Sequence, residues 1–485
     1  MLSFFLSEKR KTPILLITVA CFLAATILLP FSQCRAFTLS EEQELGRKIL
    51  EQVRRQMSLV EDGEIITYVQ SVGNRIVKQL GTTSYQYQFF VIDEAVPNAF
   101  AVPGGYIFIH RGLIELMKSE GELAGTISHE LAHVQAHHIE RNMKEGTLLT
   151  IATLAGILAG VLVGGKTDAS PALMMGSIAG AQSAQLKFSR ENEEEADQLG
   201  FRYLCAAGYP PEAMVSVMQR LNQAKWLSNS RVPSYLLTHP ALSERIQYLG
   251  DLVQKQKGVP GKTCTPIKNQ GDFPIMQAAL VAEYSDPQMA EERFQAAIRQ
   301  GDAVGEYGLG RLYLRQGKPA EALPHLQAAA RKEAASPFIL STLGAAYYRQ
   351  GNLSEARKVL QSALVLDPSA SVVHYRLALA LQEMGLKEEA LQHLQQIEGF
   401  SPSFPDIDYR LGVVLGQINR VGLAHYYLGR FYEHKQDWKL AFFHYNKAKD
   451  LLQDAPQKRE EAKQRLKEVE KKKKDAYWEK LRNGP

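Results

Sequence analysis

The stretch ISHELAHV at residues 127–134 places two histidines four positions apart within an apolar segment. On an α-helix, residues i and i+4 share a face, so His129 and His133 can present ring nitrogens to one ion. Glu130 lies beside them and can reach a water molecule on that ion. Zinc takes imidazole and carboxylate ligands and, in catalytic sites, keeps one position for water, whose pKa falls to about 7. The stretch therefore predicts a buried helix with a zinc site, in which Glu130 is the general base.

Two more histidines, His137 and His138, follow this motif directly. His137 falls on the same helix face one turn after His133 and could compete as a ligand. A polar helix end is the alternative, and we favour it for both residues.

A third protein ligand is expected about 60 residues later, in the acidic run at residues 191–197. At helical spacing one stripe combines two carboxylates with two small residues that permit close packing: Glu193, Ala196, Asp197 and Gly200. Glu193 is the predicted ligand, and Asp197 can accept the outward N–H of a ligating histidine. Glu194 and Glu195 are expected to be dispensable for the metal. A solvated acidic face is the alternative, and the upstream histidine pair makes it the weaker one.

Two strands are expected before the zinc-site helix, at residues 85–92 and 106–110, because the first run alternates and both are rich in aromatic and β-branched residues. The residues Pro103-Gly104-Gly105 indicate a tight turn before the second strand. The segment between the strands is a candidate rail on which Asn98 and Ala99 would contact extended substrate backbone. A plain structural hairpin is the alternative.

A histidine directly before a proline, His239-Pro240, follows further along the chain. The residue before a proline is held extended, which suits the placement of an imidazole over the zinc site. His239 would act there as a catalytic oxyanion stabiliser or as an occluding ligand. Arg245, on the following helix, can reach substrate or a carboxylate. Simple helix capping is the structural alternative.

The N-terminus has the layout of a secretory signal peptide, with basic residues at 9–11, an apolar run at 14–29 and a small residue, Ala36, at the expected cleavage point. The apolar run is short for a membrane span, which needs about 20 residues, although an uncleaved anchor remains open.

Removal of residues 1–36 would leave two of the four cysteines, Cys205 and Cys264. An even pair in an exported protein suggests one disulfide, and two buried free thiols are the alternative.

Two uncharged stretches lie between the expected metal ligands, at residues 147–165 and 169–186. The first repeats glycine at every fourth position, which lets helices approach closely, and the second is more polar. We expect an apolar helical hairpin that is buried or touches a membrane, rather than two true spans.

A 34-residue period follows a Gly/Pro-rich linker. Its leading leucines are each 34 positions apart: Leu309, Leu343, Leu377 and Leu411. Its turn glycines keep the same spacing: Gly317, Gly351 and Gly385. These features are typical of tetratricopeptide repeats, which stack into a superhelix with a concave surface for a peptide or another protein. The period slips by half a repeat at Leu428, so one helix is missing or shared there.

The formal charge of +4 is local, because residues 456–485 hold 11 Lys/Arg and 6 Asp/Glu, a balance of +5. Nucleic acid is therefore not expected as a partner. The basic tail is expected to be a solvated capping helix, with contact to an anionic membrane surface as the sharper alternative.

Four segments carry a family resemblance: Asn98 to Gly105, His129 to His133, Ser189 to Asp197, and His239-Pro240 with Arg245. Together they resemble metallopeptidase family forty-eight, which includes HtpX and the CAAX prenyl proteases. A signal sequence ahead and tetratricopeptide repeats behind most resemble its periplasmic BepA-type members, which act in outer-membrane protein quality control. The resemblance implies one zinc ion on His129, His133 and Glu193, and a role for the repeats in recruiting a substrate or an assembly partner.

The sequence thus predicts an α+β fold, a mostly helical zincin-type (gluzincin-like) domain with a small sheet, followed by an α-helical repeat superhelix. The expected parts are a signal peptide (1–36), a zinc metallopeptidase domain (37–255), a linker (256–273), the repeat domain (274–455) and a charged C-terminal helix (456–485). The expected function is that of a periplasmic zinc endopeptidase acting on envelope proteins. A repeat-based chaperone or scaffold with an inactive protease domain is the alternative.

Overall fold

The computed structural model describes residues 38–139, 141, 189–227, 235–257, 272–333, 335–399 and 404–483. The expected signal peptide, the apolar segment 147–186 and Cys264 lie outside these ranges. Cys205 is disulfide-bonded, and its pairing with Cys264 remains a prediction. In the part of the chain that the structure describes, no helix is long and apolar enough to cross a membrane.

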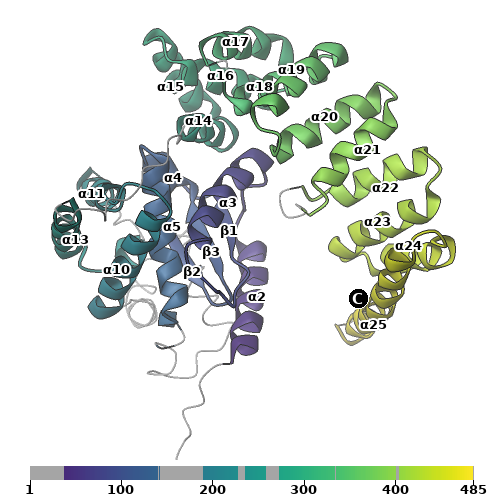
Figure 1. Ribbon diagram of the computed structural model, residues 1–485, viewed down its shortest axis with the longest axis horizontal. Coiled ribbons are helices and arrows are strands. Elements are labelled where there is room, and N and C mark those ends of the chain that lie inside the picture. The colour runs from purple at the N-terminus through teal and green to yellow at the C-terminus, as the bar shows by residue number, and fades with distance from the viewer. Residues whose placement is uncertain are drawn as a thin grey trace, which may run out of the picture.

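The N-terminal domain is mostly helical with one small sheet (Figure 1). Its elements are α2 (Leu39–Gln56), α3 (Gly63–Val77), β1 (Gln88–Ile92), β2 (Ala99–Val102), β3 (Tyr106–His110), α4 (Arg111–Leu116), α5 (Glu120–Gln135), α10 (Arg190–Ala206), α11 (Glu212–Leu227), α12 (Tyr235–Thr238) and α13 (Leu242–Lys257).

The sheet has the order β1-β3-β2. The two strands expected from the sequence are β1 and β3, and they lie parallel, while β2 pairs antiparallel with β3. Gly104 and Gly105 make the turn between β2 and β3 with φ of +83° and +89°, a region that glycine enters at little cost. The rail segment expected between the strands is therefore itself a strand, at the edge of the sheet.

Alternate strand residues face opposite sides of the sheet, and each side has its own helical cover. Phe100, Val102 and Phe108 pack against apolar residues of α2. Ala101 and Ile107 face the main core, which includes residues of α3 and α5. Helix α5, which carries His129 and His133, is thus held between the sheet and the helices α10 and α11.

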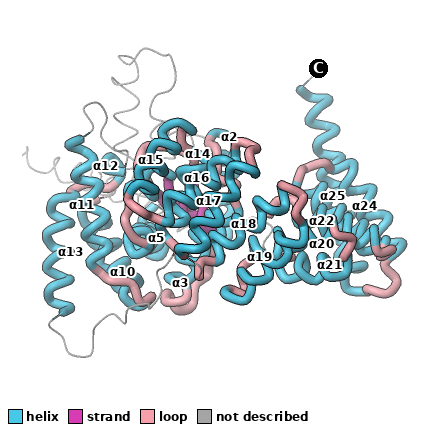
Figure 2. Tube along the Cα trace, turned by 90° about the horizontal axis from the view of Figure 1, so that it is seen from above, coloured by secondary structure: helices cyan, strands magenta, loops and turns pink. Residues whose placement is uncertain are grey.

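The C-terminal half is a curved stack of helices that starts beside α3 and α4 (Figures 1 and 2). The stack curves back beside the N-terminal domain, and His434 near its end lines one cavity with Arg54 and Gln56. Its helices are α14 (Phe273–Tyr284), α15 (Pro287–Arg299), α16 (Ala303–Arg315), α17 (Pro319–Lys332), α18 (Pro337–Arg349), α19 (Leu353–Leu366), α20 (Ser371–Glu383), α21 (Lys387–Gln396), α22 (Ile407–Gln417), α23 (Val421–His434), α24 (Trp438–Leu451) and α25 (Pro456–Asn483).

The 34-residue period appears in the turns. The glycines expected at turns have positive φ: Gly317, Gly351 and Gly385. The next position in the period is Asn419, with φ of +62°, and asparagine tolerates that region better than most residues. Gln436 adopts φ of +58° only 17 positions later, which is the half-repeat slip seen in the sequence.

The slip arises because α23 serves two neighbours. Gly412 of α22 packs against Leu428 of α23. In the same way, the equivalent glycine in the first helix of an earlier repeat packs against the second helix of that repeat. Gly429 of the same helix packs against Tyr445 of α24, as a first helix does. Of the two possibilities left open by the sequence, the structure shows a shared helix.

The repeats are fused to the N-terminal domain rather than loosely tethered. One hydrophobic core runs from the N-terminal domain through Phe273, Met276 and Leu280 of α14 to Leu343 of α18. The side chain of Gln277 donates hydrogen bonds to three carbonyl groups at the end of α4, over 2.8–3.2 Å.

A buried ionic cluster joins the same two parts. Glu64, near the start of α3, binds both Arg311 of α16 and Arg376 of α20. Arg311 also contacts Asp62, and its Nε lies 3.1 Å from Glu283. Burial alone would raise the pKa of Glu64, but the two guanidinium charges outweigh it and lower that pKa.

Candidate metal centre

Helix α5 presents two histidines from a buried stretch. Ser119 caps the helix, and its hydroxyl accepts a hydrogen bond from the backbone N–H of Glu122 over 3.3 Å. His129 and His133 share one face, with their Nε2 atoms 3.0 Å apart. Burial lowers the pKa of His133 well below its usual value, so its ring is neutral, the form that binds metal ions.

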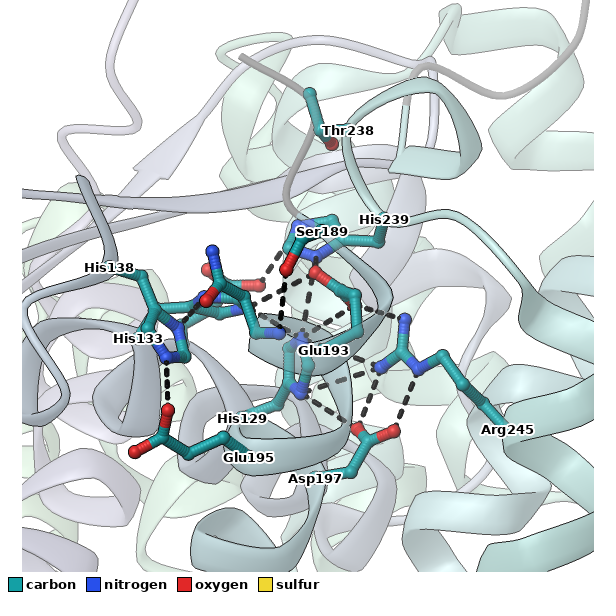
Figure 3. A network of polar contacts seen from close by, with 12 residues as sticks. His129, His133, His138, Ser189, Glu193, Glu195, Asp197, Thr238, His239 and Arg245 are labelled. Atoms are coloured by element: carbon teal, nitrogen blue, oxygen red, sulfur yellow. Dashed lines mark hydrogen bonds and ion pairs between the residues drawn. The ribbon is translucent and has the colours of Figure 1, made fainter. Parts of the chain in front are cut away.

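Helix α10 packs against α5 and brings Glu193 to the two histidines (Figure 3). Gly200 allows this approach, because a Cβ there would lie only 3.1 Å from backbone atoms of His129. The carboxylate of Glu193 lies 3.4 Å from Nε2 of His133 and 3.6 Å from Nε2 of His129. Burial alone would raise the pKa of Glu193, but the charge of Arg245 helps to hold that pKa well below its ordinary value.

His239 belongs to the same group. Its ring stacks on Tyr235 of α12, with centroids 4.3 Å apart. Its Nδ1 lies 3.0 Å from Glu193 and 3.3 Å from Nε2 of His129, and its Nε2 lies 3.6 Å from Glu130. Burial would lower the pKa of His239, but the charges of Glu193 and Glu130 raise it.

Asp197 and Arg245 lie behind the histidines. One oxygen of Asp197 is 2.9 Å from Nδ1 of His129, and Nε and a terminal nitrogen of Arg245 each lie 2.7 Å from its carboxylate. Tyr248 donates a hydrogen bond to the same carboxylate. Burial would raise the pKa of Asp197, but Arg245 and His129 hold it at about 2. Arg245 contacts the carboxylates of Glu193 and Asp197, which are one of the two kinds of partner expected from the sequence; contact with substrate stays a prediction.

The side chains present fit a metal ion. Four residues, all buried, offer one donor atom each within 4.8 Å of one another: His129, His133, Glu193 and His239. Imidazole and carboxylate form the donor set that zinc prefers. Both oxygens of Glu130 are buried and lack a hydrogen-bond partner among the described residues, so this carboxylate is available for a further partner. Burial raises the pKa of Glu130, although the charges of His239 and His129 oppose that shift.

Asn98 and Ala99 stand at the start of the edge strand β2, which packs against α5. Asn98 is fully buried, and its side-chain oxygen accepts a hydrogen bond from the N–H of Ala99 over 3.0 Å. Its carbonyl accepts from the N–H of His110. Because pairing alternates in an antiparallel ladder, Ala99 and Ala101 direct their backbone groups away from β3. This places a row of backbone groups that do not bond to β3 beside the helix that carries the histidines; these residues are buried in the described part of the chain, with Ala99 0% and Ala101 7% exposed.

Sequence reasoning missed the place of His138. Its imidazole is fully buried, and its Nδ1 lies 2.8 Å from Nδ1 of His133. Its Nε2 lies 3.1 Å from a carboxylate oxygen of Glu195. The helical extrapolation failed because α5 ends at Gln135 and His137 adopts φ of +52°, which turns the chain. His137 instead lies beside Tyr85, 3.3 Å from its hydroxyl.

Two buried histidines and a glutamate from a neighbouring helix, beside a small sheet, define a domain of the metallopeptidase class, here joined to a helical repeat superhelix. Residues 66–253 match the sequence profile of Peptidase family M48, and residues 276–338, 307–371 and 347–410 match tetratricopeptide-repeat profiles. The chain therefore carries an M48 peptidase domain followed by tetratricopeptide repeats, and the expected α+β architecture is confirmed.

Two relatives are similar to this chain over more than half of its length. The chain is 31% identical over 283 residues to the beta-barrel assembly-enhancing protease of Yersinia pestis, covering 56% of this chain and 57% of that one. It is 26% identical over 311 residues to the protein of the same name in Escherichia coli strain K12, covering 62% of each. The chain thus spans about 60% of the length of these relatives. Among solved structures, the repeat protein YrrB has a TM-score of 0.30 and 19% identity, covering 40% of this chain and 95% of that one.

Proposed function

We propose that the chain is an exported, zinc-dependent endopeptidase that acts on envelope proteins. The observation that carries this proposal is the cluster formed by His129, His133 and Glu193. Beside it lies the carboxylate of Glu130, which has no hydrogen-bond partner among the described residues. Relatives named as proteases and the match to a peptidase family support the same reaction class.

In this proposal His129, His133 and Glu193 hold one zinc ion, which when bound supplies Lewis-acid chemistry at a peptide carbonyl. Glu130 takes the proton of the attacking water on a carboxylate oxygen and later delivers it to the leaving amine. Its burial favours this exchange, because a raised pKa makes the carboxylate a stronger base.

His239 has two possible roles, and its position supports both. Its Nε2 faces Glu130 and could donate to the oxyanion of the reacting carbonyl, as a catalytic residue. Its Nδ1 lies among the expected ligands and could occupy the position that water needs. Arg245 serves the site through Glu193 and Asp197, whose charges it neutralises, rather than through substrate.

The outer edge of β2, which is the last strand of the described sheet, is the proposed place for substrate backbone, and a peptide there would need the cover of Ala99 and Ala101 to move aside. An extended peptide could pair with Ala99 and Ala101 and so lie along the sheet next to α5. Asn98 would fix the start of this strand, since its side chain and its carbonyl both bind neighbouring backbone groups.

The repeats are proposed to recruit an envelope protein-assembly partner or substrates. Stacked repeats provide binding area along a curved surface. The names of the Yersinia and Escherichia relatives connect such a chain with beta-barrel assembly, and thereby with outer-membrane protein assembly or quality control in the periplasm. Contact with a membrane surface through the basic helix α25 belongs to the same proposal.

Metal analysis together with a proteolysis assay tests the proposal. Purified protein should contain one zinc ion per chain and cleave casein, and a chelator should stop cleavage. The alternative is a repeat-based chaperone or scaffold with an inactive protease domain. Zinc-free protein that protects clients from aggregation but never cleaves them would favour that alternative.

A further inference from the structure

The two histidines of α5 have different partners at the ring nitrogen that faces away from the cluster (Figure 3). His129 lies against the carboxylate of Asp197, with Nδ1 2.9 Å from its oxygen. His133 lies against another imidazole, that of His138, with the two Nδ1 atoms 2.8 Å apart.

A chain of contacts extends outward from His138. Its Nε2 lies 3.1 Å from Glu195. Arg141 in turn donates a hydrogen bond to the same oxygen of Glu195, over 2.9 Å. His138 is fully buried, whereas the side chains of Glu195 and Arg141 are 45% and 44% exposed. The contacts therefore lead from the buried metal centre to the protein surface.

The ionised carboxylate of Glu195 determines which ring nitrogens of His138 and His133 carry hydrogen. An ionised carboxylate only accepts hydrogen bonds, so Glu195 requires N–H at Nε2 of His138. A neutral imidazole has one N–H, which leaves Nδ1 of His138 as an acceptor. His133 must then donate from its own Nδ1, and its Nε2 keeps a lone pair directed at the cluster. The reverse arrangement would place hydrogen on Nε2 of His133 and block metal binding.

We propose that His138 and Glu195 are positioning residues that hold His133 in its metal-binding tautomer. This inference rests on the proposed function, because it assigns His133 as a metal ligand. Partners of this kind orient the ring and raise the basicity of a ligating histidine. The backbone turn at His137 is what brings His138 back onto the ring of His133.

The chain of contacts from His133 through His138 to Glu195 is called the relay here. It is tested by measuring zinc affinity in competition with a chromogenic chelator. His138→Phe keeps the ring volume but removes the acceptor, and should weaken zinc binding about 10–100-fold, the range found when such partners are lost. His138→Asn places an amide oxygen near the position of Nδ1, and should restore most of the loss. Glu194→Ala is the matched control, because Glu194 is exposed and accepts a hydrogen bond from Gln198, and this variant should bind zinc like wild type.

A double-mutant cycle separates a relay from a packing effect. In contrast to the expectation from the sequence that Glu195 is dispensable, Glu195→Ala alone should weaken zinc binding several-fold, because Glu195 contacts His138. The same change should have no further effect in the His138→Phe background. Additive losses would overturn the proposal, as would wild-type affinity of His138→Phe. If His138→Phe does not fold, the partly exposed Glu195→Ala variant decides by itself.

The position of hydrogen on each histidine ring can be measured in metal-free protein, without an activity assay. Nitrogen-15 spectra of histidine-labelled, metal-free wild-type protein should show His133 with hydrogen on Nδ1 and His138 with hydrogen on Nε2. Glu195→Ala should give mixed tautomers at His138. If wild-type protein shows these tautomers but does not bind zinc, the proposed function is wrong and the relay still holds. Hydrogen on Nε2 of His133 in wild type would remove the relay, even in a protein that binds zinc.

Discussion

Asp197 Oδ1 lies 2.9 Å from Nδ1 of His129, and the guanidinium group of Arg245 binds the same carboxylate. This relationship gives Asp197 a testable role in the metal centre. Asp197→Ala should lower zinc affinity about 10–100-fold, because His129 loses the acceptor that orients its ring. Asp197→Asn keeps an acceptor and should lose less. Chelator competition at fixed pH measures both variants, and equal affinity of Asp197→Ala and wild type would contradict the assignment.

Glu130→Gln should abolish proteolysis and keep the metal. The amide cannot take a proton from water, and loss of a general base typically costs about 10²–10⁴-fold in rate. Zinc content should stay at one ion per chain, because the change leaves every proposed ligand in place. Turnover of casein at the wild-type rate would remove Glu130 as the base.

Glu193→Ala should lose zinc, whereas Glu194→Ala should keep it. Both residues lie on α10, but Glu193 is buried against the histidines and Glu194 is exposed. Metal analysis after gel filtration compares them. Zinc retained by Glu193→Ala and lost by Glu194→Ala would show that the helical register of the third ligand is wrong.

The contact between Glu64 and the repeat arginines should make the junction sensitive to acid. The folded-state pKa of Glu64 is lowered, so its ionised form contributes stability above the unfolded value of about 4.3. That contribution is lost as the pH falls through the folded-state pKa. Glu64→Gln should therefore lower the free energy of unfolding by about 3 kcal/mol at pH 7, the scale for breaking a buried pair.

Denaturant titrations at several pH values check this prediction. The difference between wild type and Glu64→Gln should be constant near pH 7 and shrink below about pH 4. Glu244→Gln is the control, because its partner Arg190 is 70% exposed, and it should change stability by less than about 1 kcal/mol. A difference for Glu64→Gln that does not depend on pH would point to packing instead of charge.

Much of this architecture follows from sequence spacing. Residues four apart must share a helix face, and the stripe from Glu193 to Gly200 indicates which face of α10 is buried. Long-range contacts carry no such periodic signal. His138 reaches His133 only because the helix ends early, and Arg311 meets Glu64 from 247 positions away. The half-repeat at Leu428 could be counted in the sequence, but only packing on both sides shows that α23 is shared.

The core that joins the two parts of the molecule predicts how truncations will behave. A chain that ends after residue 257 should aggregate or unfold, because it loses Phe273, Met276 and Leu280 of α14, which are at most 2% exposed. Burial of three such side chains contributes about 5–9 kcal/mol, a large share of the stability of an ordinary domain.

A chain that ends after Asp367 keeps α14 to α19 and the main core, and should still bind zinc and cleave an unstructured peptide. This truncated chain should recover fewer partners, because the deleted repeats contribute binding area without supplying residues to the metal centre. Circular dichroism, zinc content, peptide cleavage and pull-down of envelope proteins should be compared for full-length chain and both truncations. Full partner recovery by the chain ending after Asp367, or a folded and active chain ending after residue 257, would contradict this division of roles.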